Sequence, residues 1–205
     1  MVVGYGDGSV KKWDLKAASS LFHYKPPPAD DTDEPQSVLC VDLLDSGNLV
    51  AIGTETGHVT FLNSNTGKQI CTFTVTSTNN NPITDMEEED AGESIAAVES
   101  VAFSPCGCFL AAGSVNATLC VWDISLQRIR HTLTGPAGVT KVLWNGGSVV
   151  SACLDGVVRC WDHRSGELVL EVTGNGGNIL DMVVTQDGRY LLTAGDDCTA
   201  RVFEM

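Results

Sequence analysis

Hydrophobic and polar residues alternate in short runs along most of the chain, and turn-forming residues bound each run. Three pairs with a period of two show the pattern clearly: Val101/Phe103, Val142/Trp144 and Met182/Val184. This period is typical of a β-strand that buries one face. We find no stretch that sustains the 3.6-residue period of a helix. The pattern therefore predicts an all-β protein.

The strands recur in units of about forty residues. Trp-Asp pairs close the third strand at 13–14, 122–123 and 161–162, and degenerate forms occur at 62–63 and 203–204. Short strands repeated in this way around an axis predict a β-propeller. The predicted repeat units are 1–25, 36–75, 95–135, 137–174 and 178–205, with acidic loops at 26–35 and 76–94.

The predicted ring is incomplete. Seven or eight blades need about 280 to 320 residues, whereas the chain has 205. Its units make a single partial propeller, 1–205, of about four and a half blades. Because the pattern begins at a second strand, we expect the carboxy-terminal part of a larger propeller, as a truncated product or an incomplete gene model. Unpaired strand edges favour aggregation, so an incomplete, non-functional propeller fragment is the alternative reading.

The turns before the third strands, together with the Trp-Asp endings, resemble the WD-repeat family. The turns are Gly6-Asp7-Gly8-Ser9, Leu154-Asp155-Gly156-Val157 and Asp196-Asp197-Cys198-Thr199. In that family a turn aspartate, a second-strand hydroxyl, the third-strand tryptophan and an upstream histidine form a hydrogen-bonded tetrad. The resemblance implies that role for the aspartates Asp7, Asp155 and Asp197, the hydroxyls Ser114, Ser151 and Thr193, and the tryptophans Trp13, Trp122 and Trp161.

The chain departs from the family pattern at several tetrad positions. Gly135-Pro136 and Gly174-Asn175 stand where the Gly-His pair is expected, and Gly57-His58 lies before a third strand instead. Thr56 and Asn116 replace the turn aspartate. We therefore expect fewer buried tetrads than in a strict WD repeat.

Longer segments are similar to the carboxy-terminal half of the angio-associated migratory cell protein family. They include residues 2–10, 13–16 and 151–162, and Glu93-Ser94 leading into the following strand. The resemblance implies a non-catalytic protein-interaction scaffold associated with cell migration and angiogenic signalling. A related fungal WD-repeat protein implies a further role, the escort of a basic ribosomal protein during ribosome assembly.

The formal net charge is −14 at pH 7, and much of it comes from the two predicted acidic loops. Their acids are Asp30, Asp31, Asp33, Glu34, Asp85, Glu87, Glu88, Glu89, Asp90 and Glu93. Nucleic-acid binding is disfavoured, because phosphate contacts need a cationic surface. The loops are either solvated disordered linkers or an electrostatic dock for a basic protein. The predicted partner-binding residues are Asp45, Asp85, Glu87, Glu88, Glu89, Asp90 and Asp187.

Residues with catalytic or ligating chemistry are scattered. The four histidines fall in different units without a repeating Ser or Cys partner, so no catalytic triad is predicted. Cys106-Gly107-Cys108 lacks the second ligand pair of a zinc site, and the cysteines are expected to act mostly as small apolar residues. We therefore predict no enzyme activity, cofactor, metal or small-molecule substrate.

The cellular location is predicted from the apolar runs and the cysteine content of the chain. No apolar run approaches eighteen residues, so no transmembrane segment is expected. A cysteine-rich chain without a secretory signal fits a reducing compartment. The expected location is the cytoplasm, with the nucleus as a second site.

Overall fold

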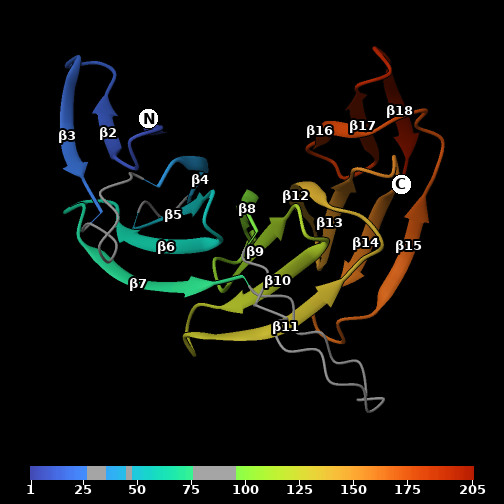
Figure 1. Ribbon diagram of the computed structural model, residues 1–205, viewed down its shortest axis with the longest axis horizontal. Coiled ribbons are helices and arrows are strands. Elements are labelled where there is room, and N and C mark those ends of the chain that lie inside the picture. The colour runs from blue at the N-terminus through green and yellow to red at the C-terminus, as the bar shows by residue number, and fades with distance from the viewer. Residues whose placement is uncertain (27–35, 45–47, 76–95) are drawn as a thin grey trace, which may run out of the picture.

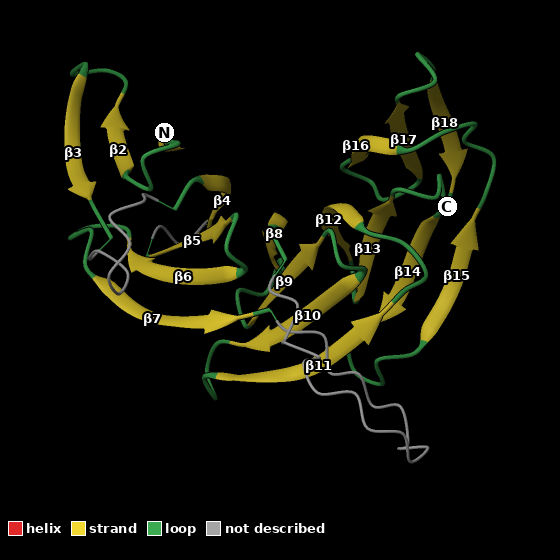
Figure 2. Ribbon diagram, viewed as in Figure 1, coloured by secondary structure: helices red, strands yellow, loops and turns green. Residues whose placement is uncertain are grey.

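The computed structural model describes residues 1–26, 36–44, 48–75 and 96–205, and there it consists of strands joined by turns (Figure 1, Figure 2). Eighteen strands in these residues form five antiparallel sheets. The described part of the chain contains no helix long and apolar enough to cross a membrane.

Each sheet is built from strands that follow one another in the sequence. The first holds β1 (Val2–Gly4), β2 (Val10–Asp14) and β3 (Ser19–Tyr24). The second holds β4 (Val38–Leu43), β5 (Leu49–Thr54), β6 (His58–Asn63) and β7 (Gln69–Thr74). The third holds β8 (Val98–Phe103), β9 (Phe109–Ser114), β10 (Thr118–Asp123) and β11 (Arg128–Thr134). The fourth holds β12 (Val139–Asn145), β13 (Ser148–Cys153), β14 (Val158–Asp162) and β15 (Leu168–Val172). The fifth holds β16 (Ile179–Val184), β17 (Tyr190–Gly195) and β18 (Ala200–Glu204).

The five sheets follow one another around an open arc (Figure 1). Strands β4, β8, β12 and β16 lie on the inner side of the arc, and β7, β11 and β15 lie on the outer side. Adjacent inner strands contact each other, from β4 to β8, β8 to β12 and β12 to β16. The sheets that carry the two termini lie at opposite ends of the arc. This arrangement confirms the predicted all-β propeller architecture.

Five equivalent turns, between β1 and β2, β5 and β6, β9 and β10, β13 and β14, and β17 and β18, use the same backbone geometry. One residue in each turn has positive φ, between 59° and 77°. These residues are Gly8, Gly57, Ala117, Gly156 and Cys198. At Gly156 the requirement is double, because an added Cβ would also lie 2.7 Å from the Gly177 carbonyl oxygen. The repeated φ explains why three of the five positions are glycine.

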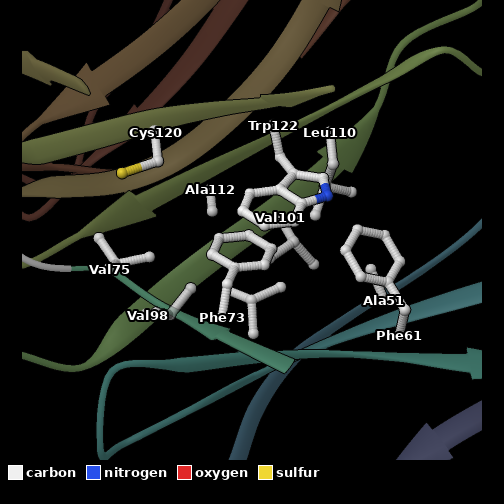
Figure 3. Packing of buried hydrophobic residues seen from close by; sticks show 11 residues of the cluster. Ala51, Phe61, Phe73, Val75, Val98, Val101, Leu110, Ala112, Cys120 and Trp122 are labelled. Atoms are coloured by element: carbon white, nitrogen blue, oxygen red, sulfur yellow. The ribbon is translucent and has the colours of Figure 1, made fainter. Parts of the chain in front are cut away.

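The hydrophobic core is divided among the interfaces between neighbouring sheets. In one interface, Ala51 and Phe61 of the second sheet pack against Val101 and Leu110 of the third. Figure 3 shows this cluster, in which the Phe73 ring stacks on Trp122 with centroids 4.1 Å apart. Equivalent clusters join the third sheet to the fourth and the fourth to the fifth. Each sheet is therefore stabilised mainly by its neighbours, as expected for a repeat architecture.

The last sheet carries an apolar row on the face directed away from the fourth sheet. Val183, Leu192 and Val202 pair across β16, β17 and β18, and their exposures are 57%, 37% and 64%. We call these three residues the uncovered row. In the preceding sheets, the residues equivalent to Leu192 are Val150 and Ala111, and both are fully buried. The row therefore has the composition of a blade interface, but no described sheet packs on it.

Candidate functional site

Two predicted tetrad residues meet inside the fourth sheet. Trp161 on β14 donates a hydrogen bond from Nε1 to Ser151 Oγ on β13, over 3.1 Å. The Ser151 side chain is almost fully buried and Trp161 is 8% exposed. The indole N–H is thus satisfied away from water, which buried polar groups require.

The turn aspartate of this sheet binds an arginine. Arg159 Nη1 and Nη2 donate to the two carboxylate oxygens of Asp155 at 3.1 and 2.6 Å. Arg159 Nε donates to Glu171 Oε1 at 2.8 Å. Burial alone would raise the pKa of Asp155, but the hydrogen bonds from Arg159 and Val157 N outweigh it and hold that pKa below its usual value. The hydrogen bond to Asp155 likewise raises the pKa of Arg159, so this ion pair is charged at neutral pH.

The last sheet repeats this arrangement at its turn. Arg201 Nη1 donates to Asp197 Oδ2 over 2.9 Å, and Thr199 Oγ1 donates to Asp197 Oδ1 over 2.7 Å. These bonds, the one from Thr199 first, lower the pKa of Asp197 to about 2. An arginine four residues beyond the aspartate therefore takes over as its partner in both sheets. Sequence reasoning missed Arg159 and Arg201, although the shared Asp-x-x-x-Arg spacing was visible.

Asn175 occupies the place where the family pattern expects a histidine. Thr193 Oγ1 donates to Asn175 Oδ1 over 2.7 Å, and Asn175 Nδ2 donates to the Gly156 carbonyl over 3.1 Å. The amide thus links the second strand of the last sheet to the turn of the preceding sheet. Thr193 contacts this amide, so part of the polar network survives without the histidine.

In the first sheet, the turn aspartate bonds to a residue of its own turn. Asp7 Oδ1 accepts hydrogen bonds from Ser9 Oγ at 2.6 Å and from Ser9 N at 3.0 Å. The Ser9 hydroxyl is the main reason that the pKa of Asp7 is lowered. Trp13 lies half-buried on β2, where its backbone N–H donates to the Met1 carbonyl.

Ser114 departs from its predicted role. It lies two residues beyond Ala112, and Ala112 is the position equivalent to Ser151. Ser114 Oγ donates to the carbonyls of Ala97 and Ala96, at 2.8 and 3.0 Å. Ser114 therefore anchors the segment that enters β8, while Trp122 stacks on Phe73 (Figure 3).

Among the predicted partner-binding residues, the structure places Asp187. It lies in the turn between β16 and β17, where Thr185 Oγ1 donates to its carboxylate at 2.6 Å. This hydrogen bond is the main reason that the pKa of Asp187 is lowered, so the side chain is anionic at neutral pH. Asp45, Asp85, Glu87, Glu88, Glu89 and Asp90 lie outside the described residues.

A hollow of about 350 Å³ opens at the ends of β4, β8 and β12. It is lined by Asp42, Leu43, Leu44, Ala102, Phe103, Ser104, Pro105, Leu143 and Trp144. We call it the inner hollow. Phe103 N donates to Asp42 Oδ2 over 2.7 Å, and Trp144 Nε1 donates to the Ala102 carbonyl over 2.9 Å. These bonds tie three successive sheets together around the opening.

Aromatic and cationic side chains gather beside the inner hollow. Trp144 lies 6.3 Å from Phe109 and 5.6 Å from His163, measured between ring centroids. The Arg130 guanidinium lies 5.5 Å from the Phe109 centroid, and its Nε donates to the His163 carbonyl. Trp and Arg are the residue types that dominate protein–protein contacts. This end of the sheets is therefore the candidate protein-binding face.

The same end of the propeller extends to Asp187. The inner strands β4, β8, β12 and β16 all end here, and Asn145 Nδ2 donates to the Gly188 carbonyl across the fourth and fifth sheets. Apolar, aromatic and carboxylate groups therefore share one surface, which suits recognition of another protein. Among the described residues, no group of three or more His, Cys, Asp or Glu side chains is arranged to hold a metal ion.

Comparisons with known proteins agree with this architecture. The family model described as the nucleolar protein 10-like, N-terminal domain, a β-propeller, matches residues 19–203. Angio-associated migratory cell protein of Homo sapiens is 33% identical over 205 residues, covering 98% of this chain and 45% of that protein. Ribosome assembly protein SQT1 of Saccharomyces cerevisiae is 25% identical, covering 97% of this chain and 47% of that protein. These matches confirm the resemblance that the turn and Trp-Asp motifs indicate.

A solved structure shows the same fold. The crystal structure of Saccharomyces cerevisiae Sqt1 matches with a TM-score of 0.79 and 22% sequence identity. The match covers all of this chain and 55% of that chain. The chain thus spans about half the length of the curated relatives it matches.

Proposed function

We propose that this chain, which belongs to the nucleolar protein 10-like β-propeller family of WD-repeat proteins, is a non-catalytic scaffold that binds a basic protein. The observation that carries this proposal is the acid excess, 26 Asp and Glu against 12 Lys and Arg. Such an excess steers a basic partner towards the protein and discriminates against acidic ones. The relatives named above are an angio-associated migratory cell protein and a ribosome assembly protein, which supports a binding role over an enzymatic one.

The proposed client is a basic ribosomal protein, held during ribosome assembly. The relative called ribosome assembly protein SQT1 supports this choice. A role in cell migration or angiogenic signalling is the second candidate, supported by the 33% identity to angio-associated migratory cell protein. For either role we propose that the protein lies in the cytoplasm, with the nucleus as a second location.

The proposed contact surface is the candidate protein-binding face. The inner hollow supplies apolar and aromatic contacts through Leu43, Phe103 and Trp144, and Asp42 supplies a carboxylate. Asp187 adds a second carboxylate farther along the same end of the sheets. Aromatic anchors give such a contact its affinity, whereas carboxylates select basic side chains.

Co-purification tests the proposed client. The tagged full chain is recovered from a cytosolic lysate, and bound proteins are identified by mass spectrometry at low salt and at about 0.15 M ionic strength. Enrichment of a basic ribosomal protein that decreases as salt rises supports the client. Recovery of general chaperones alone at both salts indicates a fragment that does not fold, and a cooperative melting transition separates that outcome from a folded chain with another partner.

Two matched substitutions test the surface. Leu43→Arg places a cation at the inner hollow, where it repels a basic client. Leu154→Arg makes the same change at the opposite end of the sheets. The wild-type side chains have nearly equal exposure, 37% and 38%, so unspecific effects should be similar. We expect Leu43→Arg to lose the client and Leu154→Arg to retain it. Equal losses would move the contact away from this face.

A further inference from the structure

Two cysteines lie on the exposed turn between β8 and β9. Cys106 and Cys108 are both solvent-exposed, and Gly107 between them has a φ of 70°. Gly107 N donates to the Ser104 carbonyl over 2.8 Å, and Ser104 N donates to the Phe109 carbonyl over 2.9 Å. The backbone thus folds this segment into a tight turn that presents two thiols to solvent.

The two thiols have different surroundings. Ser104 Oγ accepts a hydrogen bond from Phe109 N over 3.0 Å. The hydroxyl proton of Ser104 can therefore be donated to another acceptor. Cys106 Sγ lies 3.3 Å from this hydroxyl. Cys108 Sγ instead donates to the Cys106 carbonyl over 3.7 Å. A hydroxyl that donates to sulfur stabilises the thiolate, so Cys106 is the better nucleophile of the pair.

The proton affinities agree with this geometry. The hydrogen bond from Ser104 lowers the pKa of Cys106. The neighbouring Cys106 side chain raises the pKa of Cys108. Cysteines packed within the sheets behave differently, because desolvation raises the pKa of the half-buried Cys40 to about 12 and that of the buried Cys120 to about 11. An accessible thiolate beside a second thiol is the arrangement found at redox-sensitive cysteines.

We propose that Cys106 and Cys108 form a thiol–disulfide exchange site, at which Cys106 attacks a low-molecular-weight disulfide and Cys108 resolves the product. In the first step, the Cys106 thiolate displaces one thiolate from the disulfide and forms a mixed disulfide. In the second, Cys108 loses its proton to solvent and attacks the Cys106 sulfur, releasing the second thiolate. The protein thiols are oxidised by two electrons, and the small disulfide is reduced to two thiols.

The order of attack follows from the same contacts. Formation of the mixed disulfide removes the anionic sulfur of Cys106, which is what opposes ionisation of Cys108. The resolving thiol therefore becomes more acidic only after the first step. The new bond closes a short ring on an exposed turn, and strained, exposed disulfides are the readily reduced ones. The exchange is thus reversible, and it occurs next to the inner hollow, because the lining residues Ser104 and Pro105 directly precede Cys106.

Reaction of the full chain with oxidised glutathione tests the proposal, with products located by mass spectrometry. In the wild type we expect loss of two hydrogens, a bond between Cys106 and Cys108, and no glutathione retained on either of these two cysteines. Cys108→Ser should keep one glutathione on Cys106. Cys106→Ser should react at Cys108 several-fold more slowly than Cys108→Ser reacts at Cys106, because Cys108 lacks the hydroxyl contact that stabilises the Cys106 thiolate.

Cys198 provides an internal comparison that needs no variant. It is also solvent-exposed, but it lies on the turn between β17 and β18 at the other end of the sheets. In the wild-type chain Cys106 should be modified before Cys198. The proposal is overturned by equal rates at these two cysteines, by a wild-type product in which Cys106 remains a mixed disulfide, or by equal rates in Cys106→Ser and Cys108→Ser.

Discussion

Trp161 and Ser151 join strands β14 and β13 through a buried hydrogen bond of 3.1 Å from the indole Nε1 to the serine Oγ. The Ser151 hydroxyl in turn lies 3.4 Å from the Arg159 carbonyl, to which it donates. One small side chain on β13 therefore contacts both the tryptophan and the backbone of the buried arginine on β14. Polar contacts of this kind fix the pairing of strands whose apolar residues would tolerate other arrangements.

Replacement of Ser151 by alanine should lower the free energy of unfolding by about 1–3 kcal/mol, because it leaves the buried Trp161 N–H without an acceptor. Urea denaturation followed by tryptophan fluorescence measures the change. Ser148→Ala on the same strand, where the side chain is only partly buried, is the control and should cost much less. Equal costs would mean that the hydrogen bond contributes nothing specific.

Arg159→Met should destabilise the protein strongly. The Arg159 side chain is 4% exposed, and its loss leaves Asp155 and Glu171 without their cation. These carboxylates are 30% and 46% exposed, so water screens part of the cost, and we expect about 2–3 kcal/mol. Arg189→Met is the matched control, since Arg189 and Glu204 are 63% and 71% exposed. That change should cost below about 1 kcal/mol, and a larger cost would contradict the role of burial.

Acid should unfold the protein through its turn aspartates. Hydrogen bonds from Thr199 and Arg201 lower the pKa of Asp197 to about 2 in the folded state, while the unfolded value is about 3.9. A depressed pKa contributes stability that is fully present above the unfolded value and is lost as the pH falls towards the folded value.

The free energy of unfolding should therefore decrease between about pH 5 and pH 2. Asp197→Asn should reduce the slope in this window relative to that of the wild type. Urea midpoints at a series of pH values measure both slopes. An Asp197→Asn slope identical to that of the wild type would assign the acid sensitivity to other groups.

Alanine substitutions at two glycines should distinguish the cost of a left-handed backbone from the cost of a steric clash. Gly146 has a φ of 57° and nothing within 4 Å of an added Cβ, whereas an added Cβ at Gly156 would lie 2.7 Å from the Gly177 carbonyl oxygen. Gly146→Ala should therefore cost only the left-handed strain, about 1 kcal/mol. Gly156→Ala should cost at least about 1 kcal/mol more. Thermal and urea unfolding measure both, and equal costs would show that the turn relaxes without penalty.

The uncovered row should tolerate a polar atom that the blade interfaces reject. Val202 is 64% exposed and Val121, its counterpart in the third sheet, is fully buried. Val121→Thr should cost about 1–3 kcal/mol, because it buries a hydroxyl without a partner. Val202→Thr should change the free energy of unfolding by less than about 0.5 kcal/mol. A large cost at Val202 would reveal that something covers this row in solution, and sedimentation at several concentrations would then identify self-association.

The alternating pattern was sufficient to predict the strands, but it could not place every side chain along them. Ala112 and Ser114 are two residues apart, so they fall on the same face of β9 and the period of two cannot distinguish them. The pairing of Trp122 with Leu110 shows which of the two is equivalent to Ser151, because it sets Ala112 at the position that Ser151 holds in the fourth sheet. Register between strands is a tertiary property that one strand's sequence does not contain.

The candidate site was predicted only in part for a different reason. Asp155 and Asp197 were expected to act with a histidine, and the absence of Gly-His suggested that fewer polar clusters would form. Arg159 and Arg201 supply the missing partners from within the third strand itself. The inner hollow could not be foreseen, because Leu43, Phe103 and Trp144 come from three sheets that meet only in the folded chain.

The division of the core among sheet interfaces also determines where the molecule opens first. Among the sheets that the structure describes, the third is packed on both faces, whereas the last has a packed neighbour on one face only. Local opening should therefore begin at the ends of the arc and advance inwards one sheet at a time. Backbone amides of β8 to β11 should exchange their hydrogens most slowly, and proteases should reach β16 to β18 while the middle of the arc is still intact.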